Sequence, residues 1–215
     1  GVPPINESLA TLHFPPAGAD VATLLSFSSP AQQRLIFGEL FFIQWMLARR
    51  RAGVMKEAAV PLHWDKEIVD EIKRRLPFAL TGAQRRVVNE ILKDMANPHP
   101  MHRLLQGDVG SGKTIVAWIA ALVAWRKEAQ AAVMAPTEIL AEQHYRRFIS
   151  LCEGLPVRVA LLTSSLSGKR RESMRKEIRE GEAHIVIGTH AIIQEGVEFR
   201  RLGLGIVDEQ HRSGV

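Results

Sequence analysis

Several features that would place a protein outside the cell or in a membrane are absent from this 215-residue sequence. The single cysteine, Cys152, excludes an internal disulfide and fits a reducing cytosol. The most apolar stretch, residues 35–47, is interrupted by Glu39 and Gln44 and is too short to span a bilayer. The first residues lack the charged-then-apolar pattern of a signal peptide. We therefore expect a cytoplasmic protein with no membrane partner.

Further absences narrow the possible functions. The sequence contains no internal repeat and no low-complexity tract. His144, His190 and His211 do not have the spacing of metal ligands, and no cysteine pair supports a zinc site. The formal net charge is +5, which suits a polyanion such as nucleic acid but is equally compatible with an ordinary basic protein. A hydrophobic share of 46% and a charged share of 24% are typical of a globular protein.

The N-terminal part of the chain is predicted to be a connecting segment. Residues 1–20 are rich in Pro, Gly and Ala and are expected to form an extended linker. A Ser-Pro pair at residues 29–30 is typical of a helix start, and apolar residues then recur at helical spacing. This pattern predicts one long amphipathic helix over residues 31–51. We assign residues 1–61 to the linker and long helix, and residues 62–215 to a second domain.

The second domain shows a regular alternation of elements. A short helix is expected at residues 65–75, and Thr81 is expected to cap a helix that runs to Met95. The alternation that follows predicts an α/β fold, with a parallel sheet covered by helices on both faces. The expected strands are residues 103–106, 131–135, 157–162, 184–187 and 204–207, and the expected helices are residues 115–125, 139–151 and 169–179.

A complete phosphate-binding loop is the most informative motif. It has the form G-x-x-x-x-G-K-S/T and consists of Gly107, Asp108, Val109, Gly110, Ser111, Gly112, Lys113 and Thr114. The glycines allow backbone N–H groups to surround a phosphate, Lys113 can reach the β- and γ-oxygens, and Thr114 can ligate Mg²⁺. The apolar helix expected next would direct its N-terminus at the phosphates. These features predict a P-loop NTPase that uses a nucleotide with Mg²⁺.

A pair of carboxylates, Asp208 and Glu209, follows the last expected strand. An acidic residue in this position can hold the Mg²⁺ that bridges the phosphates, and a second can act on the attacking water. We assign Asp208 to the metal and Glu209 to general-base catalysis, alongside Lys113. Alone, such a pair would be read as surface carboxylates that end a strand. Its position downstream of a phosphate-binding loop favours the catalytic assignment.

Polar residues also follow three of the other expected strands. Hydroxyl and backbone N–H groups near helix starts suit contacts to nucleic-acid phosphates. Thr137 is equally plausible as an ordinary helix cap. The residues predicted to contact nucleic acid are Pro136, Thr137, Thr163, Ser164, Gly188, Thr189 and His190.

Upstream of the phosphate-binding loop, Gln84 and Phe78 are candidates for adenine recognition. The Gln84 amide carries a donor and an acceptor that can pair with the edge of adenine, and Phe78 can pack against the base. From the residues alone, Thr81 is simply a helix cap and Gln84 a polar residue of the first turn.

Four segments together resemble a known family. Residues 107–114, 136–144, 188–191 and 208–212 are similar to motifs I, Ia, Ib and II of the superfamily-two DNA translocases, and most similar to the RecG family of bacterial ATP-dependent DNA helicases. The resemblance implies a RecA-like lobe, use of ATP and Mg²⁺, and remodelling of branched double-stranded DNA such as stalled forks and Holliday junctions. It also implies association with the bacterial nucleoid.

The resemblance assigns further roles along the chain. Residues 78–84 are similar to the adenine-recognising Gln motif, which supports Gln84 and Phe78 as nucleotide contacts. Gln210 and His211 of motif II are expected to couple hydrolysis to movement. The chain is expected to be a fragment that ends after motif II, whose partners are the second motor lobe and the wedge domain of a parent protein. Such a fragment is expected to bind nucleotide but not to unwind DNA alone.

Four alternatives are compatible with parts of this pattern. The transcription-repair coupling translocases share the Gly-Asp-Val-Gly and Asp-Glu-Gln-His segments, although Ser111 favours the RecG family. A module that binds nucleotide or DNA without turnover is a second alternative. An unrelated transport ATPase is disfavoured by Gln84 and the Thr-His strand end, and a GTPase by the lack of an Asn-Lys-x-Asp motif.

Overall fold

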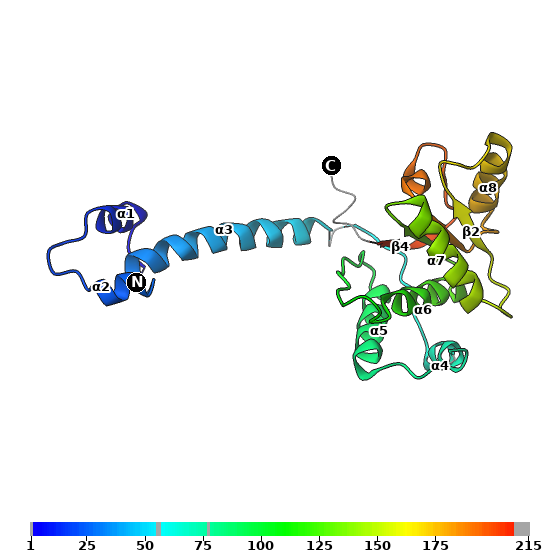
Figure 1. Cartoon of the computed structure of the whole chain (residues 1–215), viewed down its shortest axis with the longest axis horizontal. Helices are drawn as coiled ribbons and strands as arrows, with labels where there is room; N and C mark the ends of the chain where they lie inside the picture. The colour runs from blue at the N-terminus through cyan, green and yellow to red at the C-terminus, as the bar shows by residue number, and fades with distance from the viewer. Residues whose placement is uncertain (1, 55–56, 77, 209–215) are drawn as a thin grey trace. The chain divides into compact units, whose positions relative to one another are not determined.

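The computed structural model describes residues 2–54, 57–76 and 78–208. The chain divides into two compact units, Gly1–Glu57 and Ala58–Val215 (Figure 1). In the described part of the chain, no helix combines the length and apolar character needed to cross a membrane.

The first unit is helical. It contains α1 (Ile5–His13), α2 (Val21–Leu25) and α3 (Pro30–Val54). The expectation of an extended linker over residues 1–20 was therefore wrong for α1, which packs against α3. The buried hydroxyl of Ser8 donates to the Pro4 carbonyl at 2.9 Å, which closes the first turn of α1. Proline ahead of the helix does not prevent it, because the first turn needs no N–H donor there.

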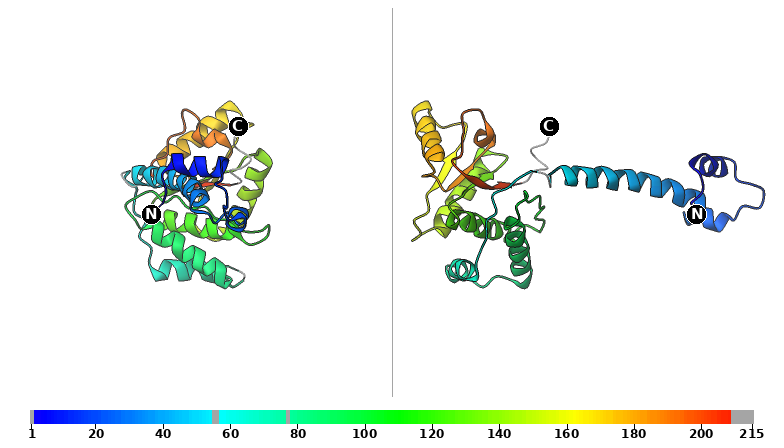
Figure 2. Two further views of the ribbon diagram at one scale, coloured as in Figure 1. Left: turned by 90° about the vertical axis from the view of Figure 1, so that its left-hand side faces the viewer. Right: turned by 180° about the vertical axis from the view of Figure 1, so that it is seen from behind.

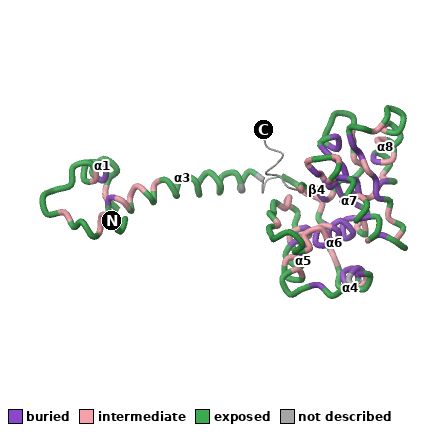
Figure 3. The backbone as a smooth tube through the Cα atoms, in the orientation of Figure 1, coloured by how far each residue is buried: buried purple, intermediate pink, exposed green. Residues whose placement is uncertain are grey.

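The long helix α3 begins as predicted but is not amphipathic. Ser29 and Gln32 exchange hydrogen bonds in a capping box, in which Ser29 Oγ accepts from Gln32 N at 3.4 Å and Ser29 N donates to Gln32 Oε1 at 3.3 Å. The apolar side chains do not form one stripe, because consecutive residues such as Phe41, Phe42 and Ile43 point in directions about 100° apart. Figure 3 shows most of α3 as exposed.

The second unit contains a four-stranded parallel sheet of order β2-β3-β1-β4. Its strands are β1 (Gln130–Met134), β2 (Val159–Leu162), β3 (Ile185–Gly188) and β4 (Leu202–Val207). Each of these overlaps a predicted strand. The pairing of β1 with β4 contains a bulge, because Gln130 pairs with Leu202 but Ala131 pairs with Leu204. Gly203 is the extra residue, and a Cβ there would lie 2.7 Å from the Cβ of Ala129.

Helices cover both faces of the sheet, as predicted. Alternate strand residues point to opposite faces, so Val133 and Ile187 join one hydrophobic core while Ala132 and Val186 join another. Figure 2 shows α6 and α8 on opposite sides of the strands. The first core involves α4 (Lys66–Arg74), α5 (Gly82–Met95), α6 (Lys113–Arg126) and α7 (Glu138–Leu151), and the second involves α8 (Gly168–Glu180) and the 3-10 helix η1 (His190–Ile193).

The central helix of the first core is α6. Trp118, Ile119 and Ala121 are fully buried, because α6 contacts β1 and β4 on one side and α4 and α5 on the others. A helix surrounded in this way carries apolar residues all round its circumference. The run of apolar residues after the phosphate-binding loop therefore indicates a buried helix, and its N-terminus carries the loop.

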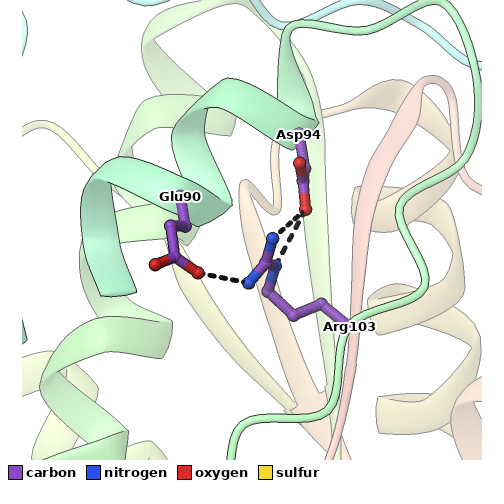
Figure 4. A network of polar contacts seen from close by, with 3 residues as sticks. All are labelled: Glu90, Asp94 and Arg103. Carbon is purple, nitrogen blue, oxygen red and sulfur yellow. Dashed lines mark hydrogen bonds and ion pairs between the residues drawn. The ribbon is translucent and has the colours of Figure 1, made fainter. Parts of the chain in front are cut away.

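One predicted strand is absent. Residues 103–106 are neither a strand nor buried, and the Leu104 side chain is 83% exposed. The segment is held instead by Arg103, which bonds to two carboxylates of α5, Glu90 at 2.6 Å and Asp94 at 2.8 Å (Figure 4). These contacts with Asp94 and Glu90 raise the pKa of the Arg103 guanidinium. Among the described residues β4 is an edge strand with an open outer side, but no backbone hydrogen bond joins residues 103–106 to it.

Candidate active site

The phosphate-binding loop takes its shape from two glycines with left-handed backbone. Gly110 has φ of 83° and Gly112 has φ of 88°, a region in which other residues are strained. Gly112 is also the N-cap of α6, and a Cβ on it would collide with the Nε2 atom of Gln84. Within the loop, Ser111 N donates to Asp108 O at 3.1 Å. The loop therefore turns tightly into the helix at positions where only glycine fits without strain.

The N-terminus of α6 and Lys113 supply positive potential to the loop. The first N–H groups of a helix have no intrahelical acceptor and, with the helix dipole, favour an anion. Lys113 Nζ lies 2.7 Å from the Gly107 carbonyl and 2.9 Å from the Asp108 carbonyl. The ammonium group is thus turned toward its own loop, within reach of the space that the backbone surrounds.

Gln84 connects α5 to the phosphate-binding loop. Its Oε1 atom accepts from Thr81 N at 2.9 Å, which completes a capping box at the start of α5. Its Nε2 atom donates to the Ser111 carbonyl at 2.8 Å. The amide that completes the helix cap therefore also contacts the phosphate-binding loop, and adenine recognition by Gln84 stays a prediction. Phe78, the other predicted adenine contact, has 43% of its surface exposed.

The carboxyl ends of the four strands meet at one edge of the sheet, because all four are parallel. In spatial order, the residues that follow β2, β3, β1 and β4 are Thr163, Thr189, Pro136 with Thr137, and Asp208. The loops also contact one another, since Ser165 N donates to the Glu138 carboxylate at 3.0 Å. The sheet thus brings together the residues predicted to contact nucleic acid and the predicted metal ligand.

The polar residues at this edge differ in their exposure. Thr137 is exposed, and its hydroxyl caps α7 by accepting from Leu140 N at 3.3 Å. Ser164 and His190 are also exposed. Thr163 and Thr189 are only 4% and 8% exposed, and their hydroxyls bond within their own loops. The side chains available to a ligand are therefore those of Thr137, Ser164 and His190.

Basic side chains surround the loop after β2. Arg171 donates from Nη2 to the Ser164 carbonyl at 2.6 Å, and exposed Lys169 and Arg170 precede it at the start of α8. Arg175 donates to the Glu195 carbonyl at 3.2 Å, in the segment that follows η1. This concentration of positive charge beside exposed hydroxyls suits a phosphate backbone.

Gly188, which ends β3, is required by close packing. A Cβ on Gly188 would collide with the carbonyl oxygen of Leu162 in β2. No such constraint applies to Gly205 in β4, where an added Cβ would meet nothing within 4 Å. The glycine in the predicted Gly188-Thr189-His190 motif therefore has a structural role between two strands.

Asp208 is held by two contacts from the β1–α7 segment. Its N–H donates to the Met134 carbonyl at 2.8 Å, and its Oδ2 atom lies 2.7 Å from Nε2 of His144. In the sequence, His144 was rejected as a metal ligand and placed at the end of motif Ia, and no local signal pairs it with a residue 64 positions away. Glu209, Gln210 and His211, predicted as base and coupling residues, lie outside the described residues.

The predicted Mg²⁺ ligands fit a metal that arrives with the nucleotide. No group of three or more His, Cys, Asp or Glu side chains in the described residues can hold a metal ion. Mg²⁺ typically takes only one or two protein ligands, with phosphates and waters completing its shell. Among the described residues no hydrogen bond engages the Oδ1 atom of Asp208, so one carboxylate oxygen is available, as is the hydroxyl of Thr114. No hydrogen bond or ion pair there joins Asp208 to the phosphate-binding loop.

Residues 81–215 match the family model described as "DEAD/DEAH box helicase". The chain belongs to the DEAD/DEAH box helicase family. The match begins at Thr81, so this helicase segment includes Gln84, the phosphate-binding loop and all four strands. It confirms the predicted fold class and the ATP-binding character that the phosphate-binding loop indicates.

Curated relatives extend the similarity of this helicase chain over its whole length. It is 45% identical over 213 residues to the ATP-dependent DNA helicase RecG of Aquifex aeolicus, and 46% identical over 211 residues to that of Pasteurella multocida. These alignments cover 99% and 98% of this chain but only 27% and 30% of those proteins. The chain thus spans less than a third of the length of these relatives.

A solved structure shows the same fold. The structure described as RecG bound to a three-way DNA junction matches with a TM-score of 0.80 and 44% sequence identity. The match covers 85% of this chain and 25% of that chain. The predicted resemblance to the RecG helicases is therefore confirmed by sequence and by structure.

Proposed function

We propose that this chain is the nucleotide-binding lobe of an ATP-dependent DNA helicase that remodels branched DNA, such as stalled forks and Holliday junctions, in the bacterial cytoplasm. The observation that supports the proposal is the parallel sheet, in which Asp208 and the loops that contain Thr137, Ser164 and His190 all follow strand ends at the same edge, with the Thr137 loop next to Asp208. The relatives are named as RecG helicases, and the related structure contains a three-way DNA junction.

Nucleotide binding requires a change of partners at Lys113. Its ammonium group exchanges the carbonyls of Gly107 and Asp108 for the β- and γ-phosphate oxygens. The two bonds that Lys113 gives up have lengths of 2.7 and 2.9 Å. The N–H groups of the loop and of the first turn of α6 complete the phosphate cradle.

Asp208 and Thr114 hold the metal, and Glu209 acts on water. Mg²⁺ held there would neutralise charge on the phosphates during phosphoryl transfer. Asp208 contributes its Oδ1 side, and Thr114 contributes its hydroxyl. Glu209 takes the proton of the attacking water, with the role of general base. Gln210 and His211 transmit the state of the nucleotide to the rest of the motor.

DNA occupies the exposed side of the strand-end edge. Thr137, Ser164 and His190, with the adjacent cations of α8, contact phosphates rather than bases. The relatives are more than three times as long as this chain, so the proposed second motor lobe and wedge domain belong to the remainder of the polypeptide. Transition-state stabilisation by arginines of the second lobe completes the catalytic site.

Two substitutions in the full-length polypeptide test the separate roles of the carboxylates. Glu209→Gln keeps Mg-ATP binding and lowers ATP hydrolysis about 100- to 10,000-fold, because the base is lost while the geometry survives. Asp208→Asn shifts the Mg²⁺ dependence of binding instead. Identical phenotypes would contradict separate roles. ATP binding without any DNA-stimulated hydrolysis in the unsubstituted protein would favour the alternative of a binding module without turnover.

The 215-residue chain itself gives a second test. It is expected to bind adenine nucleotides and DNA weakly, and its DNA affinity falls as salt rises, because phosphate neutralisation releases counterions. Strand separation is not expected, since the proposed charge clamp requires the second lobe. The measurement is an unwinding assay on a synthetic fork with ATP. Robust unwinding by this chain would show that the second lobe is not required. It would contradict the proposal that the chain is one lobe of a two-lobe motor.

A further inference from the structure

The contact between His144 and Asp208 joins a helix to a strand end across 64 residues of sequence. An ionised carboxylate only accepts hydrogen bonds, so His144 Nε2 is the donor and Asp208 Oδ2 the acceptor, at 2.7 Å. Charge-assisted hydrogen bonds of this length are the stronger ones in proteins. The His144 side chain is 18% exposed and that of Asp208 is 33% exposed. The pair is therefore partly shielded without being sealed from water.

Both contacts of Asp208 come from one continuous segment. β1 supplies the Met134 carbonyl, which accepts from Asp208 N, and α7 supplies the His144 ring. The backbone bond fixes the position of the carboxylate stem, and the imidazole fixes its rotation. With Oδ2 engaged, Oδ1 is the oxygen left for a ligand among the described residues.

Stability alone does not account for this pair. A strand-end carboxylate that is one-third exposed remains hydrated and needs no protein partner, and ion pairs in such positions contribute about 0–1 kcal/mol. Ordering both side chains also has an entropic cost. The pair therefore adds little stability but restricts the Asp208 carboxylate to one rotamer. A carboxylate that must bind a metal in a defined direction needs this restriction.

We propose that His144 is a positioning residue that orients Asp208 so that its free oxygen faces the Mg²⁺ of the bound nucleotide. This rests on the function proposed above. His144 lies on the same helix as the DNA-facing Thr137, seven residues or about 10 Å further along it. Helix α7 therefore links Thr137, which caps its first turn, to the carboxylate of Asp208, which its residue His144 contacts.

The chain offers closely matched variants. His144→Phe keeps the ring volume but removes the donor, whereas His144→Gln places an amide Nε2 donor near the original position. Arg146→Ala is the control, because it removes an exposed ion pair with Glu142 (3.6 Å) on the same helix without touching Asp208. If His144→Phe does not fold, His144→Asn replaces it, since its shorter amide does not reach Asp208 Oδ2.

The experiment measures binding of a fluorescent, non-hydrolysable ATP analogue to the full-length polypeptide during a Mg²⁺ titration, and again in EDTA. For His144→Phe we expect the half-saturating Mg²⁺ concentration to rise about tenfold or more, with unchanged affinity in EDTA, because partners of metal ligands typically alter metal affinity by this factor. His144→Gln is expected to restore most of the wild-type value, and Arg146→Ala to match wild type.

The outcomes separate the two proposals. Wild-type Mg²⁺ dependence in a folded His144→Phe variant would overturn the positioning role and leave the proposed function intact. An equal loss of affinity with Mg²⁺ and in EDTA would also overturn it, because that pattern indicates general disruption of the site. Absence of Mg²⁺-dependent nucleotide binding in the wild-type polypeptide would instead contradict the proposed function itself.

Discussion

The phosphate-binding loop and the four strand ends belong to one unit but are held by different means. Residues 107–111 are exposed, lie outside the sheet, and contact their surroundings through Gln84 and Lys113. The strand ends are fixed by parallel backbone pairing and by two hydrophobic cores. The loop therefore depends on a few exchangeable side-chain bonds and can rearrange around a phosphate, whereas the edge formed by the strand ends is preformed.

The strongest test of this contrast is Lys113→Ala in the full-length polypeptide. ATP hydrolysis is expected to fall at least about 100-fold, because the only ammonium of the loop is lost. The thermal unfolding temperature should stay near wild type, since within the described residues the Lys113 side chain bonds to loop carbonyls alone. Lys176→Ala, which removes an exposed pair with Glu180 (3.9 Å), is the control. Near-normal turnover in Lys113→Ala would refute the assignment of the loop.

Alanine substitutions at two strand glycines, Gly188 of β3 and Gly205 of β4, test the preformed edge. Gly188→Ala is expected to lower the free energy of unfolding by about 1–3 kcal/mol, because its Cβ meets the backbone oxygen of Leu162. Gly205→Ala should change it by less than about 0.5 kcal/mol, since its Cβ enters open space. Urea denaturation of the 215-residue chain measures both. Equal effects would show that the close approach of β2 and β3 is not rigid.

Gln84 offers a third test, because its amide both caps helix α5 and bonds to the phosphate-binding loop. Gln84→Ala removes both bonds and is expected to lower the free energy of unfolding by about 1 kcal/mol. Gln84→Glu keeps the acceptor for Thr81 N but cannot donate to the Ser111 carbonyl. It should therefore retain stability while weakening nucleotide affinity. Nucleotide titration measures the affinity of each variant, and thermal unfolding measures its stability. A Gln84→Glu variant with wild-type nucleotide affinity would show that the bond to the Ser111 carbonyl is dispensable.

The smallest effect is expected at the opposite end of the sheet, where burial lowers the pKa of His184. His184 Nδ1 accepts from Arg158 N at 2.9 Å and so must be unprotonated in the folded state. As pH falls through about 6.5, the unfolded chain binds a proton that the folded chain does not, so stability falls. In His184→Asn the amide oxygen accepts without titrating. The wild-type unfolding temperature should therefore drop more between about pH 7.5 and pH 5.5 than that of the variant.

Long periodic segments were predictable from sequence, and pairings between them were not. The strands β1, β2 and β3 and the helix α6 follow from apolar runs of the right length, because most of their residues are buried. The polar helix α8 followed only from its place between two expected strands. Residues 103–106 have the same local character yet lie outside the sheet. An apolar run does not reveal whether a partner strand is available. Helix α1 was missed because its flanking prolines and glycines suggested a linker.

The same distinction applies to the site. Gly110, Gly112 and Lys113 could be assigned because a continuous motif specifies backbone and side chain together. The double role of Gln84 was only half predictable: its cap is local, whereas its bond to Ser111 spans 27 residues. The contact between His144 and Asp208 depends on the strand order, which no sequence spacing encodes. Tertiary contacts of this kind follow from packing rather than from local pattern.

The bulge at Gly203 has a consequence at the other end of β4. Side chains alternate between faces, so inserting one residue reverses the phase of everything that follows. In unbroken pairing from Gln130 and Leu202, Leu204 would stand opposite Ala132 and point to the face of α8. The extra glycine shifts it to Ala131, so Leu204 and, by alternation, Asp208 point to the face of α7. One residue without a side chain, five positions upstream, thus decides on which face of the sheet the Asp208 carboxylate emerges.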